Sequence, residues 1–138
     1  MRILFDTNVV LDLLLDRTPH ALAAGLLISA VERKRLAGSL CATSVTTLDY
    51  LIAREIGRER SRSAIRTMLR LFDVAAVTRA VLQTALELEF EDYEDAVVHE
   101  AARAADAQGI VTRSMSDFRA SALPVFSPEE LVASLADS

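Results

Sequence analysis

The sequence has little cysteine, glycine or lysine, and each shortage excludes a class of protein. The one cysteine, Cys41, cannot form an internal disulfide, and its apolar neighbours place it in the expected core. The four glycines form neither a dinucleotide-binding fingerprint nor a phosphate-binding loop. The one lysine, Lys34, ends an expected helix far from every acidic motif, which argues against a phosphate-accepting response-regulator domain.

Long hydrophobic runs and a signal-peptide layout are also missing. Apolar residues make up 51% of the chain, yet no stretch of 18 lacks a charge or a helix breaker. We therefore expect a cytoplasmic protein with no membrane partner. A length of 138 residues suits one domain spanning 1–138, with room for a sizeable core.

The net charge of −5 is distributed unevenly along the chain. Residues 54–70 carry six arginines and two glutamates, a charge of +4, whereas residues 81–106 carry eight acids and one arginine, a charge of −7. Arg58, Arg62 and Arg66 are spaced four apart and share one helical face. Since arginine binds phosphate and stacks on bases, we take these three as candidate nucleic-acid-binding residues; a solvated helix face or pairing with a protein partner is the alternative.

Expected strands alternate with expected helices along the whole chain. The strands are expected at 2–5, 40–42, 72–77, 110–112 and 123–126. The helices are expected at 9–15, 20–35, from 43 or 44 to about 56, 59–71, 78–88, 92–108 and from 128 onward. This alternation predicts an α/β protein, a three-layer α/β/α sandwich around a four- or five-stranded parallel sheet.

Particular residues are expected to bound these helices. Asp6 or Thr7, then Thr43 or Ser44, then Thr78 are expected N-caps, and Asp92 is expected to cap its helix rather than act as a fifth site acid. Pro19 is expected in a first helical turn and Gly109 at a helix end.

Four short acidic motifs carry the strongest functional indication. They contain Asp6 after the first strand, Asp49 after the second, Asp95 on a helix, and Asp117 after the fourth strand. In a parallel sheet such places meet at the carboxyl ends of the strands, where ligands bind. Carboxylate ligands favour hard cations, so the motifs predict a site for Mg²⁺ or Mn²⁺.

The order and local context of these acids resemble the PIN-domain ribonucleases, particularly the VapC-like toxins of toxin–antitoxin pairs. The resemblance extends from Arg2 to about Leu131. It implies catalytic roles for Asp6, Asp49, Asp95 and Asp117, with Asp6, Asp95 and Asp117 as metal ligands and Asp49 orienting water. Supporting roles are assigned to the neighbouring polar residues Asn8, Thr46, Asp92, Thr112 and Ser114.

The same resemblance implies a metal-dependent endoribonuclease with an RNA substrate, a small cognate antitoxin and a homodimeric state. Two residues depart from the family pattern: Asp49 stands where glutamate is usual, and Ser114 stands where many members have aspartate, with Asp117 three residues later. Two alternatives therefore stay open, an RNA-processing nuclease without an antitoxin and a catalytically weak module that binds RNA or protein. His99 is expected to be either a surface histidine or a structural, hydrogen-bonded one rather than a ligand.

Overall fold

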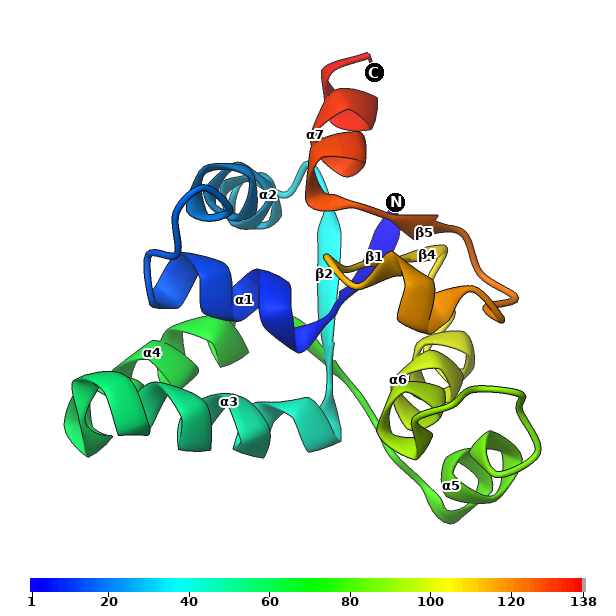
Figure 1. The fold of residues 1–138 in the computed structure, drawn as a ribbon. Coiled ribbons are helices and arrows are strands. Elements are labelled where there is room, and N and C mark those ends of the chain that lie inside the picture. The colour runs from blue at the N-terminus through cyan, green and yellow to red at the C-terminus, as the bar shows by residue number, and fades with distance from the viewer. Residues whose placement is uncertain (138) are drawn as a thin grey trace.

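The computed structural model describes residues 1–137, and its centre is a five-stranded sheet in which every strand pair is parallel (Figure 1). The order across the sheet is β3-β2-β1-β4-β5, so the first strand lies in the middle. The strands are β1 (Arg2–Phe5), β2 (Ala37–Cys41), β3 (Asp73–Ala75), β4 (Gly109–Val111) and β5 (Val125–Phe126). The predicted fold class is confirmed.

Helices cover both faces of this sheet. In Figure 1, α1 to α4 lie on one side of β1 and β2, and α5 and α6 lie on the other. The helices are α1 (Thr7–Leu14), α2 (Ala21–Glu32), α3 (Ala42–Ile56), α4 (Arg58–Leu71), α5 (Arg79–Ala85), α6 (Tyr93–Ala104) and α7 (Pro128–Ala136), with a short 3₁₀ helix η1 (Met115–Phe118).

The two faces of β1 bury different side chains. Ile3 and Phe5 pack into one core with residues of α1, α2, α3 and α7, whereas Leu4 packs into a second core with residues of α5 and α6. All three are fully buried. This alternation follows from the two-residue period of a strand, and it produces the three layers.

Side-chain caps begin several helices at the predicted residues. Asp6 accepts a hydrogen bond from the Thr7 amide at 2.9 Å, and Thr78 accepts one from the Val81 amide at 3.2 Å. Asp92 accepts one from the Glu94 amide at 2.9 Å, so its capping role is confirmed. Each bond satisfies an amide that has no partner within its helix.

Three predicted helix boundaries are wrong. The N-cap of α3 is Cys41, not Thr43 or Ser44, because β2 stays paired with β3 up to Cys41 and the helix follows at once. Pro19 precedes α2 in a turn instead of standing in its first turn. Gly109 lies in β4, where a Cβ would come within 2.8 Å of the Phe126 ring; α6 ends five residues earlier, at Ala104.

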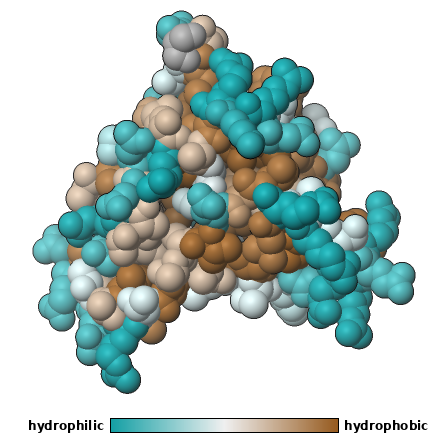
Figure 2. Space-filling view, turned by 180° about the vertical axis from the view of Figure 1, so that it is seen from behind, coloured by the Kyte–Doolittle hydropathy of each residue, from teal (hydrophilic) through white to brown (hydrophobic). Residues whose placement is uncertain are grey.

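Some large apolar side chains stay at the surface. Leu22 and Leu26 on α2 are 75% and 52% exposed, while the same helix contacts α1 and α7 through its other side. Figure 2 shows hydrophobic surface reaching the middle of one face of the molecule, between hydrophilic projections. Across residues 1–137, the helices are too short or too polar to span a bilayer.

Candidate functional site

The site starts where β1 and β4 end side by side. Phe5 pairs with Val111, so the next residues, Asp6 and Thr112, are neighbours. The Thr112 hydroxyl donates to Asp6 Oδ2 at 2.8 Å, while Asp6 Oδ1 accepts from the Thr7 amide. Thr112 is fully buried. Both oxygens of Asp6 are thereby held in a fixed orientation at the carboxyl edge of the sheet.

Two further carboxylates approach Asp6 from other elements. Asp95 stands in the first turn of α6, and Asp117 lies in η1, just beyond β4. Burial raises the pKa of Asp6, and the charge of Asp117 raises it further. Burial also raises the pKa of Asp95 to about 7, with additional repulsion from Asp6, Asp92 and Asp117. Like charges within reach of one another disfavour ionisation, so Asp6, Asp95 and Asp117 form one electrostatic cluster.

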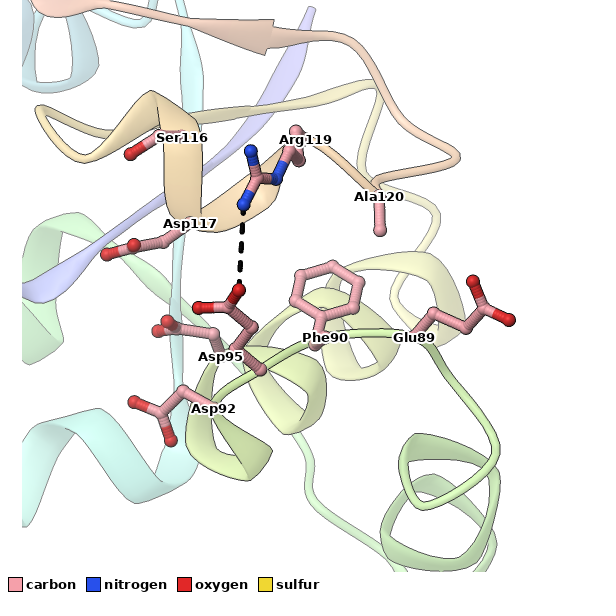
Figure 3. Close-up of a pocket in the computed structure, with 9 residues that line it drawn as sticks. Glu89, Phe90, Asp92, Asp95, Ser116, Asp117, Arg119 and Ala120 are labelled. Atoms are coloured by element: carbon pink, nitrogen blue, oxygen red, sulfur yellow. Dashed lines mark ion pairs between the residues drawn. The ribbon is translucent and has the colours of Figure 1, made fainter.

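A cavity of about 390 Å³ opens beside this cluster (Figure 3). Asp92, Asp95 and Asp117 line it, and in Figure 3 their carboxylates point to the same side. We call this cavity the acidic pocket. Its wall also includes Glu89, Phe90, Glu91, Ser116, Arg119 and Ala120.

Hydrogen bonds tie the loop after β4 to α1. The side-chain nitrogen of Asn8, Nδ2, donates to the Ser114 hydroxyl at 3.2 Å and to the Thr112 hydroxyl at 3.4 Å. Asn8 Oδ1 accepts from the Arg113 amide at 3.2 Å. Asn8, Thr112 and Ser114 are therefore brought together around Asp6. Their hydrogen bonds orient the loop that leads to Asp117, and their supporting role in a reaction stays a prediction.

An ion pair that the sequence did not reveal reinforces the same loop. Arg113 binds the buried carboxylate of Asp12 on α1 through two nitrogens, with Nη2 to Oδ1 at 3.1 Å. Two parallel hydrogen bonds fix the geometry of such a pair. The only sequence signal was that Arg113 lies directly after the expected fourth strand.

Asp49 lies in a different environment, at the contact between α3 and α4. Its Oδ1 accepts from the Ser61 hydroxyl at 2.7 Å, and its Oδ2 pairs with Arg62 Nε at 3.3 Å. The hydrogen bond from Ser61 lowers the pKa of Asp49, and Arg62 and Arg58 lower it further. Asp49, on α3, is thus bound to two residues of α4, Ser61 and Arg62. Thr46 is also occupied within α3, where its hydroxyl donates to the Thr43 carbonyl.

The three predicted arginines share one exposed side of α4. Arg58, Arg62 and Arg66 line a shallow depression of about 510 Å³ together with Glu59. Their four-residue spacing places them on one helical face. We call this surface the arginine face.

His99 is a core residue. It is buried, and its Nε2 accepts a hydrogen bond from the Ala122 amide at 3.0 Å. Burial lowers the pKa of its imidazole. His99 therefore holds the segment after η1 against α6, as expected of a structural histidine.

The cluster has the donor chemistry of a hard-cation site. Carboxylate oxygens are the ligands that Mg²⁺ and Mn²⁺ prefer, and the mutual repulsion of Asp6, Asp95 and Asp117 is the charge imbalance that a cation relieves. Over residues 1–137, however, the side chains of His, Cys, Asp and Glu form no group of three with the geometry to hold an ion. The residues thus fit a cation in chemistry, while their side chains are not arranged as a preformed coordination shell.

Comparison with known proteins gives a family match and several similar folds. The family model described as PIN domain matches residues 2–116. No curated protein matches the chain in sequence. The VapBC2 structure from Rickettsia felis, bound to a promoter DNA fragment, matches with a TM-score of 0.73 and 15% identity, over 92% of this chain and 98% of that chain.

Two other solved structures are similar. A toxin–antitoxin complex from Klebsiella pneumoniae matches with a TM-score of 0.68 and 21% identity, over 91% of this chain and 97% of that chain. VapC20 from Mycobacterium tuberculosis, described as a Sarcin-Ricin loop cleaving toxin, matches with a TM-score of 0.61 and 17% identity, over 78% of this chain and 86% of that chain. At these identities the similarity concerns the fold.

Proposed function

The chain belongs to the PIN-domain family, and from this premise we propose that it is a metal-dependent endoribonuclease acting as the toxin of a toxin–antitoxin pair. The observation that carries the proposal is that Asp6, Asp95 and Asp117 lie together at the carboxyl edge of the sheet, where burial and neighbouring charges raise the pKa of Asp6 and Asp95. A cation bound among these carboxylates would offset their negative charge. The structural similarity to a toxin described as cleaving the Sarcin-Ricin loop supports RNA as the substrate.

In this proposal Asp6, Asp95 and Asp117 hold Mg²⁺ or Mn²⁺. When bound, such an ion offsets negative charge on the reacting phosphate and makes water a better nucleophile. Thr112 orients Asp6 through its hydroxyl, and Asn8 and Ser114 fix the loop that carries Asp117. Asp92 caps α6 and adds negative charge beside Asp95. Asp49 acts on the metal site at longer range than the other three acids, because its carboxylate is already bound to Ser61 and Arg62.

The arginine face supplies the attraction for RNA in this proposal. A protein of net charge −5 repels a polyanion on average, so binding needs a local positive surface. Arg58, Arg62 and Arg66 provide one, with Glu59 in the same depression and Asp49 paired with Arg62. They bind phosphates along the RNA strand, while hydrolysis takes place at the acidic pocket.

A small antitoxin and a second copy of this chain are the proposed protein partners. Solved complexes of similar fold that contain both toxin and antitoxin support the first, with the antitoxin covering the acidic pocket. Leu22 and Leu26, exposed on α2, offer apolar surface to the second. Sedimentation of the purified protein at micromolar concentration checks the dimer, and a purely monomeric boundary would contradict it.

Cleavage of single-stranded RNA tests the function directly. The purified protein should cut a mixed RNA pool with Mg²⁺ or Mn²⁺, and EDTA should silence it. Asp6→Asn and Asp95→Asn should each lower the rate by about a hundredfold or more, because a lost ligand removes several kcal/mol of charge stabilisation. Asp49→Asn should cost less than about tenfold, since its charge is compensated by Arg62.

A matched control excludes an effect of surface charge alone. Asp73→Asn removes one exposed carboxylate at the start of β3, outside the acidic pocket, and should retain the wild-type rate. Equal rates for wild type and Asp6→Asn would mean that the activity is a contaminant. The binding-module alternative would then be favoured.

A further inference from the structure

One wall of the acidic pocket consists of an aromatic ring and a guanidinium group. Phe90, in the loop before α6, and Arg119, just after η1, line the same cavity as Asp95 and Asp117. In Figure 3 the Phe90 ring lies beside Asp95, and the Arg119 side chain extends toward the same space from the opposite segment. Neither residue belongs to the acidic motifs.

The Phe90 ring is held in position by the core behind it. Its centroid lies 5.1 Å from the His99 ring and 5.9 Å from the Phe118 ring, the latter in an edge-to-face arrangement. His99 and Phe118 are buried, whereas Phe90 is only half-buried. The ring therefore keeps a fixed orientation with one part open to the pocket. A ligand that stacks on it would pay little entropy for ordering it.

Arg119 is held by a contact that is easily exchanged. Its Nη2 lies 3.6 Å from Glu91 Oε1, and the two side chains are 77% and 94% exposed. Exposed pairs of this kind are weak, because water solvates both charges. The guanidinium can leave Glu91 for a ligand with a planar face or an anionic group.

We propose that Phe90 and Arg119 form a subsite for one unpaired nucleobase of single-stranded RNA, next to the phosphodiester at the carboxylate cluster. The inference rests on the proposed ribonuclease function. The base stacks on the Phe90 ring, and Arg119 exchanges Glu91 for the bound nucleotide. Every base has a π-face, and the uncharged ring, unlike the carboxylates around it, does not repel RNA. A cavity of about 390 Å³ lies in the range of small-ligand pockets, which supports a single nucleotide as its occupant.

Binding of two oligomers with the same backbone tests the stacking. The probes are hexauridylate and a hexamer of ribose phosphates without bases, measured by fluorescence anisotropy on the Asp95→Asn protein so that cleavage does not intervene. Adding Phe90→Leu keeps an apolar side chain against His99 and Phe118 but removes the aromatic face. We expect about a fivefold to hundredfold loss of affinity for hexauridylate and less than about twofold for the hexamer without bases.

The exchange of Glu91 is tested with a matched pair of variants. Glu91→Gln frees Arg119, whereas Glu89→Gln removes the same charge from the same pocket wall without touching Arg119. Hexauridylate should bind more tightly to Glu91→Gln than to Glu89→Gln. In an Arg119→Gln background this difference should vanish, because the two residues act as a coupled pair.

The outcomes separate failure of the subsite from failure of the ribonuclease function. Equal losses for both oligomers in Phe90→Leu, or an undiminished Glu91→Gln effect without Arg119, would overturn the subsite while wild-type cleavage persists. If the wild type neither cleaves RNA nor binds either oligomer, both proposals fall. Circular dichroism checks that Phe90→Leu is folded. The Arg119→Gln experiment is a second test, and it does not depend on the core because Arg119 is exposed.

Discussion

Asp95 and Asp49 carry the same side chain in opposite electrostatic environments. Burial and the charges of Asp6, Asp92 and Asp117 raise the pKa of Asp95 to about 7. Asp49 receives a hydrogen bond from Ser61 and the positive charge of Arg62, which lower its pKa. The region around Asp95 thus holds uncompensated like charges, whereas the region around Asp49 is neutralised within the chain. Only in the region around Asp95 can a bound cation offset negative charge that the chain leaves uncompensated.

The largest difference between the two regions should appear when Mn²⁺ is added and the stability of the protein is measured. At a Mn²⁺ concentration of about 100 times its Kd, linkage predicts a stabilisation of about 2.7 kcal/mol, visible as a higher Tm. Asp95→Asn should abolish the response, and Asp49→Asn should leave most of it. Calorimetric titration checks binding directly. An unchanged Tm at saturating Mn²⁺, with no heat of binding, would refute a shared metal site.

A smaller effect should distinguish the arginine face from the acidic pocket. Replacing Arg58, Arg62 and Arg66 by Gln removes about three phosphate contacts, so the slope of log K against log salt should flatten by up to about two units. That equals roughly a tenfold change in relative affinity between 50 and 200 mM salt. Mn²⁺ binding should stay intact.

The competing role of the arginine face gives a different result. Identical salt slopes for wild type and the triple variant, with dimerisation or antitoxin binding impaired, would assign these arginines to a protein partner. Arg33→Gln is a matched control, because it removes an arginine charge at the end of α2, outside the arginine face.

The smallest effect should appear in the pH dependence of the metal-free protein. Because the pKa of Asp95 is raised, its favourable contribution is fully present below about pH 4 and is lost as pH rises through about 7. After allowance for solvent screening, we expect a loss of about 1 kcal/mol between pH 5 and pH 8. Asp95→Asn should flatten this profile, as measured by urea unfolding at each pH.

Asp49 should give the opposite sign in the same experiment. Its pKa is lowered, so its contribution is present above about pH 4 and is lost as pH falls through the lower folded value. Asp49→Asn should therefore lower stability by a constant amount between pH 5 and pH 8, and the difference from wild type should shrink only in acid. A profile for Asp49→Asn whose slope between pH 5 and pH 8 differs from that of wild type would contradict the assignment of two separate regions.

The fold could be predicted because its signals are local. The apolar run of β1 and the caps at Asp6, Thr78 and Asp92 each act within a few residues. The boundaries were predicted wrongly where contacts with residues distant in the sequence determine the local structure. Gly109 resembles a helix terminator in sequence, but contact with Phe126 explains its place in β4.

The site was predictable only in part, for the same reason. The rule for parallel sheets brings Asp6 and Thr112 together from sequence alone. The attachment of Asp49 to Ser61 depends on how α3 packs against α4, and no local pattern encodes it. Phe90 and Arg119 lie beside predicted motifs, yet only the folded chain brings them to one cavity. The catalytic and metal roles of the four acids stay predictions.

The pairing of β1 with β4 has a consequence for synthesis of the protein. Asp6 is synthesised first, and its neighbour Thr112 and the second and third cluster carboxylates, Asp95 and Asp117, follow it by about 90 residues or more. Domains form as their segments emerge, at about 5–20 residues per second. A nascent chain that has not yet reached Asp117 therefore has no complete cluster. In the proposed function, production of the chain and the onset of its chemistry are therefore separated in time, and the proposed antitoxin, when already present, meets the protein as its cluster closes.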